Sequence, residues 1–113
     1  MINRKDFPYD DDGEVLYRLA IEGIDLNCKR NIDFSCYAVD FAIAQAIIND
    51  LASYGYKARI FVDDDEGGTG NVSVYAGMLM LPDYELLVIE QKRLNAILRF
   101  YETSCDGWVT RSS

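Results

Sequence analysis

The hydrophobic pattern of this chain changes its period at residue 40, and this change limits the possible folds more than any other feature. Residues 30–39 alternate between apolar and more polar side chains, which predicts a strand with one apolar face. The residues on that face are Ile32, Phe34, Cys36 and Ala38. From Asp40 to about residue 54 the apolar residues recur at helical spacing instead, and Asp40 is suited to cap that helix. This succession predicts a sheet with an amphipathic helix packed against it.

A similar succession of elements follows in the second half of the chain. Residues 56–62 and 71–81 predict two further strands, and Pro82 ends the second because proline cannot donate to a β-ladder. Asp83 is then expected to cap a helix that continues to about Glu102. The segment 106–110 predicts a short fourth strand. Apart from what precedes residue 30, the predicted order is therefore βαββαβ.

An additional helix is predicted over residues 13–22, with Asp11 or Asp12 as its N-cap. Together these elements predict an α+β protein of ferredoxin-like (split βαβ) type, with an antiparallel sheet, two helices on one face and an extra N-terminal helix. We expect residues 1–9 to form a flexible N-terminal arm and residues 10–113 to form a single domain, since 113 residues suffice for one core.

Composition narrows the class of protein further. No apolar run approaches the roughly 20 residues that span a bilayer, and the three cysteines form no C-x-x-C pair. Both observations fit a cytoplasmic protein with reduced thiols and no membrane contact. The chain contains no histidine, the usual general base at neutral pH, and we therefore expect no enzymatic activity.

The net charge of −8 favours basic protein partners and opposes the approach of phosphate backbones. Four consecutive carboxylates, Asp63 to Glu66, lie in the predicted hairpin loop between the second and third strands. They do not follow the calcium-loop pattern, because a loop starting at Asp63 places Val74 where the closing glutamate is required. The glycines after them lack the lysine of a phosphate loop and precede a strand. We therefore expect no metal site and no cofactor.

The second face of the predicted sheet carries a different kind of side chain. By alternation, Tyr37, Tyr75 and Phe61 point away from the core together with Lys57 and Arg59. Aromatic rings beside basic residues on central strands are typical of sheets that stack RNA bases. The characteristic basic-Gly-aromatic-Gly run of such domains is absent, however, and the net charge opposes RNA. Two interpretations stay open: the rings bind single-stranded RNA, or the first helix or the tail with Trp108 covers them.

Five short motifs, read in order, resemble one known family. They are Phe7-Pro8-Tyr9-Asp10-Asp11-Asp12-Gly13, Ile32-Asp33-Phe34, Tyr54-Gly55-Tyr56, Met80-Leu81-Pro82 and Asp106-Gly107-Trp108. At these intervals they resemble the small bacterial proteins typified by regulator of ribonuclease E activity B (RraB), over roughly residues 7–108. The family typically has glycines just before and just after the last motif, where this chain has Ser104-Cys105 and Val109.

The resemblance implies the same fold and assigns structural roles to the motif residues. They are Asp11, Asp12, Gly13, Asp33, Phe34, Gly55, Tyr56, Met80, Pro82, Asp106, Gly107 and Trp108. It also implies a non-enzymatic regulator that binds and inhibits a ribonuclease E-type endoribonuclease and so modulates RNA decay. We expect the partner to contact the exposed carboxylates, above all Asp63, Asp64, Asp65 and Glu66. An acidic immunity-type inhibitor of another basic protein is the alternative that the charge and size fit equally well.

Overall fold

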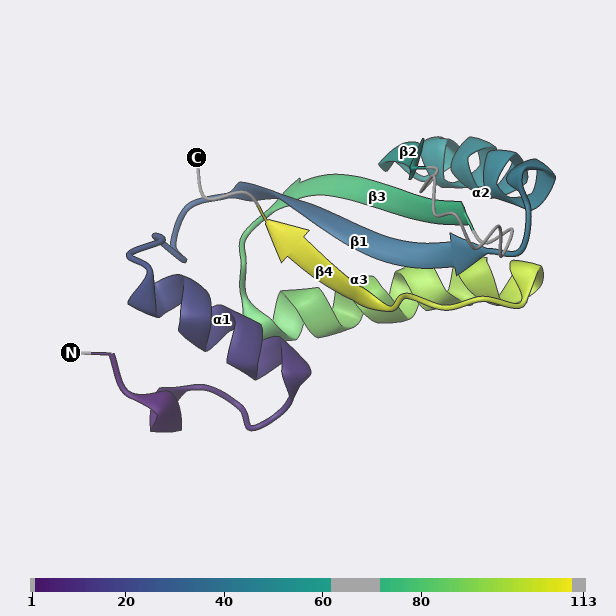
Figure 1. Ribbon diagram of the computed structural model, residues 1–113. Helices are drawn as coiled ribbons and strands as arrows, with labels where there is room; N and C mark the ends of the chain where they lie inside the picture. Colours follow the sequence, from purple (N-terminus) through teal and green to yellow (C-terminus); the bar gives the residue numbers. More distant parts are fainter. Residues whose placement is uncertain (1, 62–71, 111–113) are drawn as a thin grey trace.

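The computed structural model describes residues 2–61 and 72–110, which form three α-helices and one four-stranded antiparallel sheet (Figure 1). The elements are η1 (Arg4–Asp6), α1 (Asp11–Ile21), β1 (Arg30–Ala38), α2 (Phe41–Ser53), β2 (Lys57–Phe61), β3 (Val72–Met80), α3 (Tyr84–Leu98), η2 (Arg99–Tyr101) and β4 (Gly107–Thr110). The strand order is β2-β3-β1-β4. The predicted α+β class, antiparallel sheet, N-terminal helix and fourth strand are confirmed, whereas the ferredoxin-like assignment itself stays a prediction.

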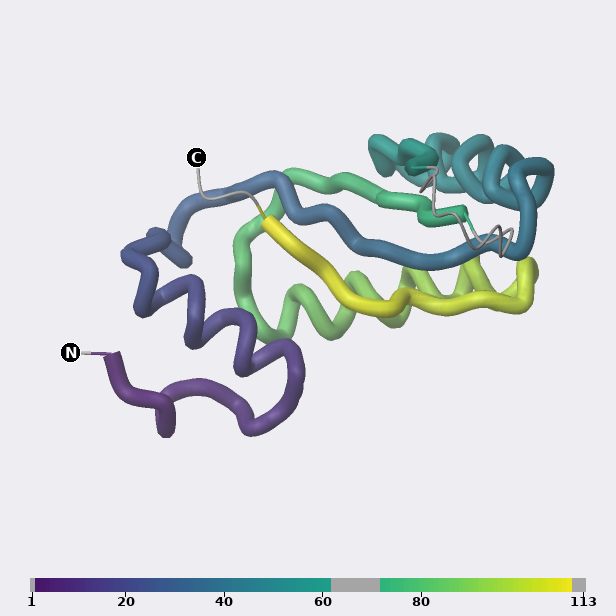
Figure 2. Tube along the Cα trace, viewed as in Figure 1, coloured from purple at the N-terminus to yellow at the C-terminus, as the bar shows by residue number. Residues whose placement is uncertain are grey.

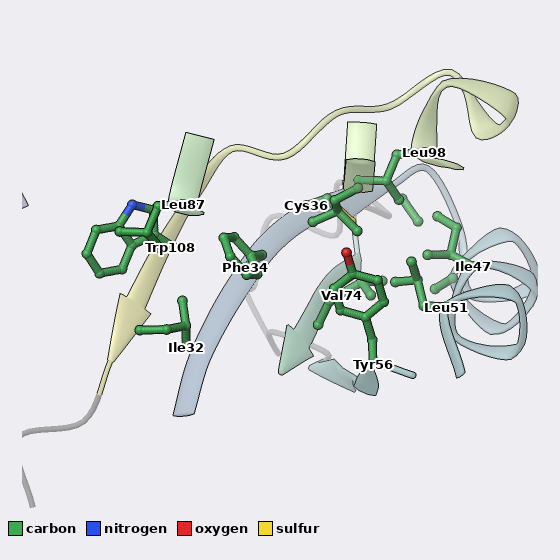
Figure 3. Packing of buried hydrophobic residues seen from close by; sticks show 14 of the residues in the cluster. Ile32, Phe34, Cys36, Ile47, Leu51, Tyr56, Val74, Leu87, Leu98 and Trp108 are labelled. Carbon is green, nitrogen blue, oxygen red and sulfur yellow. The ribbon is translucent and has the colours of Figure 1, made fainter. Parts of the chain in front are cut away.

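One hydrophobic core joins the helices to a single face of the sheet. Phe34 on β1 pairs with Ala76 on β3 and with Trp108 on β4, and all three residues are buried. The helices add buried residues to the same cluster; these are Leu16 and Leu19 of α1, Ile47 and Leu51 of α2, and Leu87, Leu94 and Leu98 of α3. Figure 3 shows several of these side chains gathered over β1. The helices therefore share one side of the sheet.

The apolar face predicted for residues 30–39 is confirmed. Ile32, Phe34, Cys36 and Ala38 are all buried, while Ile48 and Ile60 are partly buried and pack against the cluster. The flexibility predicted for residues 1–9 stays a prediction. In the structure the side chain of Arg4 donates to the carbonyl oxygens of Phe7 and Pro8 at 3.0 and 2.9 Å.

Two helix boundaries differ from those predicted. The N-cap of α1 is Asp10 rather than Asp11 or Asp12, because the Asp10 carboxylate accepts from the amide of Gly13 at 2.8 Å. Asp40 and Asp83 cap α2 and α3 as predicted. The third helix ends at Leu98 and passes into the 3-10 turn η2, and the chain then turns away at Glu102, which has a φ of 57°. A left-handed residue cannot continue an α-helix.

A buried thiol in this core leads to a prediction about alkaline stability. Burial raises the pKa of Cys36 from 9.0 to about 12. The unfolded chain therefore loses this proton at lower pH than the folded protein, so the contribution of Cys36 to stability is complete below about pH 9 and falls as the pH rises toward 12. The slope for one such group is about 1.4 kcal/mol per pH unit.

Replacing Cys36 by alanine should make the free energy of unfolding fall less steeply as the pH rises, by up to about 1.4 kcal/mol per pH unit. Urea unfolding of both proteins at several pH values between 7 and about 11 measures the difference. The constant packing cost of the substitution is read at pH 7 and subtracted. Equal slopes for the two proteins would contradict the assignment of a buried neutral thiol.

Candidate functional site

The face of the sheet opposite the helices is the main candidate surface. We call it the open face, and it consists of the outward residues of the four strands: Asn31, Asp33, Ser35, Tyr37, Lys57, Arg59, Phe61, Ser73, Tyr75, Gly77, Leu79, Gly107 and Val109. In Figure 1, α1 and α3 both lie on the other side of the strands. None of the described helices packs on this face, and Tyr37 and Phe61 remain 53% and 56% exposed.

The structure tests one of the two interpretations of these rings, namely that the first helix or the tail with Trp108 covers them. Trp108 points to the helix side, where it is buried beside Phe34. Helix α1 contacts α3 near the start of both helices (Figure 2) and contributes Leu16 and Leu19 to the core. Among the described residues, then, neither the first helix nor the strand with Trp108 covers the aromatic rings. The predicted outward placement of Tyr37 and Tyr75 is confirmed by the strand register.

Three aromatic rings lie together at one end of the open face. Tyr37 and Phe61 flank Ser73 in one row across β1, β3 and β2. Tyr75 is two residues further along β3, and its ring meets that of Phe61 edge-on at a centroid distance of 6.4 Å. The three rings thus come from three neighbouring strands, and those of Phe61 and Tyr75 are in contact.

Charged residues occupy the next part of the same face. The Arg59 guanidinium lies 5.3 Å from the centroid of the Tyr75 ring and donates to the Asp33 carboxylate at 3.2 Å. Asp33 is only 8% exposed although it is on the open face. Gly77 makes this possible, because a Cβ at that position would lie 3.0 Å from Oδ1 of Asp33. The ion pair therefore fixes the orientation of Arg59 against the aromatic ring.

A depression of about 540 Å³ lies beside this ion pair. Its lining includes Asn31, Asp33, Lys57, Arg59, Gly77 and Leu79. Lys57 makes no ion pair with any residue of the described ranges. The charged groups on the open face are thus Lys57, Arg59 and Asp33, which gives a local excess of positive charge in a chain whose net charge is −8. The predicted contact residues Asp63, Asp64, Asp65 and Glu66 lie outside the described residues.

Most motif residues build the fold instead of this face. The indole Nε1 of Trp108 donates to Oδ1 of Asp12 at 2.9 Å, and Gln91 of α3 donates to the other carboxylate oxygen at 3.1 Å. A Cβ on Gly13 would lie 2.0 Å from the carbonyl oxygen of Pro8, so only glycine allows the arm to cross the start of α1 there. These contacts connect the first helix, the third helix and the last strand (Figure 2).

The other motifs also have structural roles. Gly55 has a φ of 92°, which allows the chain to reverse after α2, and the next residue, Tyr56, is buried against α3. Pro82 is fully buried, and the amide of Asp106 donates to the carbonyl of Ser35 at 2.7 Å to align β4. The structural role predicted for Trp108 agrees with its burial.

Two residues of α3 that hold these motifs were not predicted from the sequence. Glu90 is buried and accepts from the hydroxyl of Tyr56 at 2.5 Å, and Gln91 donates to Asp12. Glu90 falls between Leu87 and Leu94 on the apolar side of the helix, and a carboxylate at such a position requires a buried donor. The need for such a donor is the feature of the sequence that could have indicated a structural role for Glu90. Tyr84, which donates to Asp10, has no comparable signal in the sequence.

The described ranges contain no group of three or more His, Cys, Asp or Glu side chains arranged to hold a metal ion. In the same ranges, no helix has the length and apolarity to cross a bilayer.

Comparison with known proteins gives a direct result for the family. The model of one family, described as regulator of ribonuclease activity B, matches residues 9–110. No curated protein matches the chain. The matched range begins just before the cap of α1 and ends with β4, so it includes all three α-helices and all four strands. The chain therefore belongs to the family of regulators of ribonuclease activity B.

Proposed function

We propose that the protein binds a ribonuclease E-type endoribonuclease in the bacterial cytoplasm and lowers its rate of RNA cleavage. The observation that supports this proposal is the family match over residues 9–110, in which the whole fold is included. The regulator acts through protein contact and performs no reaction of its own. The absence of histidine from the sequence is in keeping with such a role.

The charge of the protein suggests how the two proteins meet. A net charge of −8 on 113 residues attracts a basic segment of a nuclease over distances of about a Debye length, roughly 8–10 Å at physiological salt. Such attraction mainly accelerates association, while the short-range contacts determine how long the complex persists. We place the first contacts at Asp63, Asp64, Asp65 and Glu66, where the sequence concentrates its negative charge.

Neutralising these four residues, by Asp→Asn and Glu→Gln substitution, should slow association with the nuclease by about tenfold at low salt. It should also flatten the salt dependence of the association rate, because fewer charges contribute to steering. Stopped-flow or surface-based kinetics with a purified ribonuclease E-type enzyme measures both quantities, and RNA cleavage in the same mixtures measures inhibition.

A matched control removes four carboxylates elsewhere and so leaves the same net charge. The control residues are Asp6, Glu22, Glu85 and Glu102, which are all exposed. If both variants slow association equally, the position of the charge is irrelevant and the proposed contact site is wrong. If the unmodified protein neither binds nor inhibits the nuclease, the proposed function is wrong. The immunity-type alternative then becomes the better interpretation of the acidic surface.

A further inference from the structure

We propose that the open face of the sheet binds single-stranded RNA, through residues other than the acidic ones that we assign to the nuclease. None of the helices in the described part of the chain covers this face, which presents the exposed Tyr37 and Phe61 and the partly buried Tyr75 on three adjacent strands. Exposed aromatic rings on neighbouring strands provide stacking surfaces for successive unpaired bases. A regulator of ribonuclease activity with such a face contacts both the enzyme and its substrate.

The position of the cations supports an RNA ligand. Lys57 and Arg59 are on β2, the same strand as Phe61, with their side chains on the same face. The ammonium group of Lys57 is available to a phosphate beside the depression, because no ion pair with a described residue engages it. Arg59 is held by Asp33 across the Tyr75 ring and so extends the aromatic surface with a planar cation.

The charge and the rings of this surface favour RNA over a protein segment. The depression is lined by Asn31, Asp33, Lys57 and Arg59 together with the glycines and apolar residues Gly55, Gly77, Met78 and Leu79. Positive charge is locally in excess here, although the whole protein is negative. A face of this kind favours a flat, aromatic, negatively charged ligand, and the surrounding acidity keeps the affinity low and strongly dependent on salt.

The experiment measures fluorescence anisotropy of a labelled oligouridylate strand titrated with the full chain. We expect a Kd of roughly 1–100 μM, the range of weak nucleic-acid binding. Duplex RNA made by annealing the same strand to oligoadenylate should bind less tightly, because its bases are not available for stacking. Separate Tyr37→Leu, Phe61→Leu and Tyr75→Leu variants should each bind the single strand roughly 5- to 150-fold more weakly.

The matched control is Phe100→Leu, which removes a ring that is 84% exposed in η2, outside the sheet. This variant should bind as the unmodified protein does. Lys57→Ala should reduce the salt dependence of binding by about 0.7 in the log–log slope, the value for one phosphate contact on a single strand. Neutralising Asp63 to Glu66 should strengthen RNA binding, which is the opposite of its expected effect on nuclease binding. Circular dichroism of each variant verifies that it is folded.

Three results would overturn the proposal. The first is no anisotropy change up to about 100 μM protein, the weak limit of non-specific binding. The second is equal affinity for the single strand and the duplex, and the third is unchanged affinity in all three ring variants. None of these results bears on the nuclease assay, in which the folded ring variants should associate and inhibit like the unmodified protein. Failure of one proposal is therefore distinguishable from failure of the other.

Discussion

Replacing Phe34 by alanine is expected to lower the free energy of unfolding by about 3–5 kcal/mol. Phe34 is 1% exposed and lies in the row of β1 that pairs with Ala76 on one side and Trp108 on the other. Removing its ring leaves a cavity between the sheet and the helices that the surrounding residues cannot fill without moving. Urea denaturation followed by circular dichroism gives the change, and the slope of the transition verifies two-state behaviour.

Tyr37→Ala provides the control for this measurement. Tyr37 is on the same strand with its side chain on the open face, so its replacement removes a ring of similar size without creating a cavity. We expect its cost to stay below about 1 kcal/mol, as for most exposed positions. A cost for Phe34→Ala as small as that of the control would show that the core is centred elsewhere.

The second large effect concerns the buried pair formed by Tyr56 and Glu90. Burial raises the pKa of Tyr56, and its hydrogen bond to Glu90 adds to the shift. The hydroxyl donates to Oε1 of Glu90 at 2.5 Å, while Arg93 donates to Oε2 at 3.4 Å from a more exposed position. Tyr56→Phe leaves the carboxylate of Glu90, which is 7% exposed, with Arg93 as one weak donor. This substitution should lower the free energy of unfolding by about 1–3 kcal/mol.

A double-mutant cycle separates the energy of the Tyr56–Glu90 hydrogen bond from the packing energy of each side chain. Glu90→Leu removes the carboxylate, and in that background Tyr56→Phe should cost less by about 0.5–3 kcal/mol, the range of coupling between contacting residues. Tyr54→Phe is the matched control, because the same atom is removed two residues away on an exposed ring. Additive free energies for Tyr56→Phe and Glu90→Leu would show that the hydrogen bond has no stabilising role.

Sequence periodicity predicted most of this fold because most of it is local in origin. The apolar positions of β1 and α2 alternate or recur over distances of a few residues, and Asp40 is the only capping residue at its boundary. The start of α1 is different. Three consecutive aspartates offer three possible caps; Asp10 is the one used, while Asp12 accepts from Trp108, 96 positions away in the sequence. No rule based on neighbouring residues predicts that contact.

The same distinction between local and long-range determinants applies to the candidate site. Alternation alone predicted that Tyr37 and Tyr75 share the face with Lys57 and Arg59, and the register confirms it. Alternation did not predict that the three described α-helices all leave this face uncovered, because that depends on where α1 docks. The ion pair of Arg59 with Asp33 is also beyond sequence reasoning, since it needs the missing side chain of Gly77 on the strand between them.

The contact between Asp12 and Trp108 has a consequence for how the first helix is attached. Its partner indole is the single tryptophan of the chain and belongs to β4. Helix α3 binds the same end of α1 through Tyr84 and Gln91. A chain that lacks β4 therefore keeps these two contacts with α3 but loses the indole that ties the first helix to the sheet.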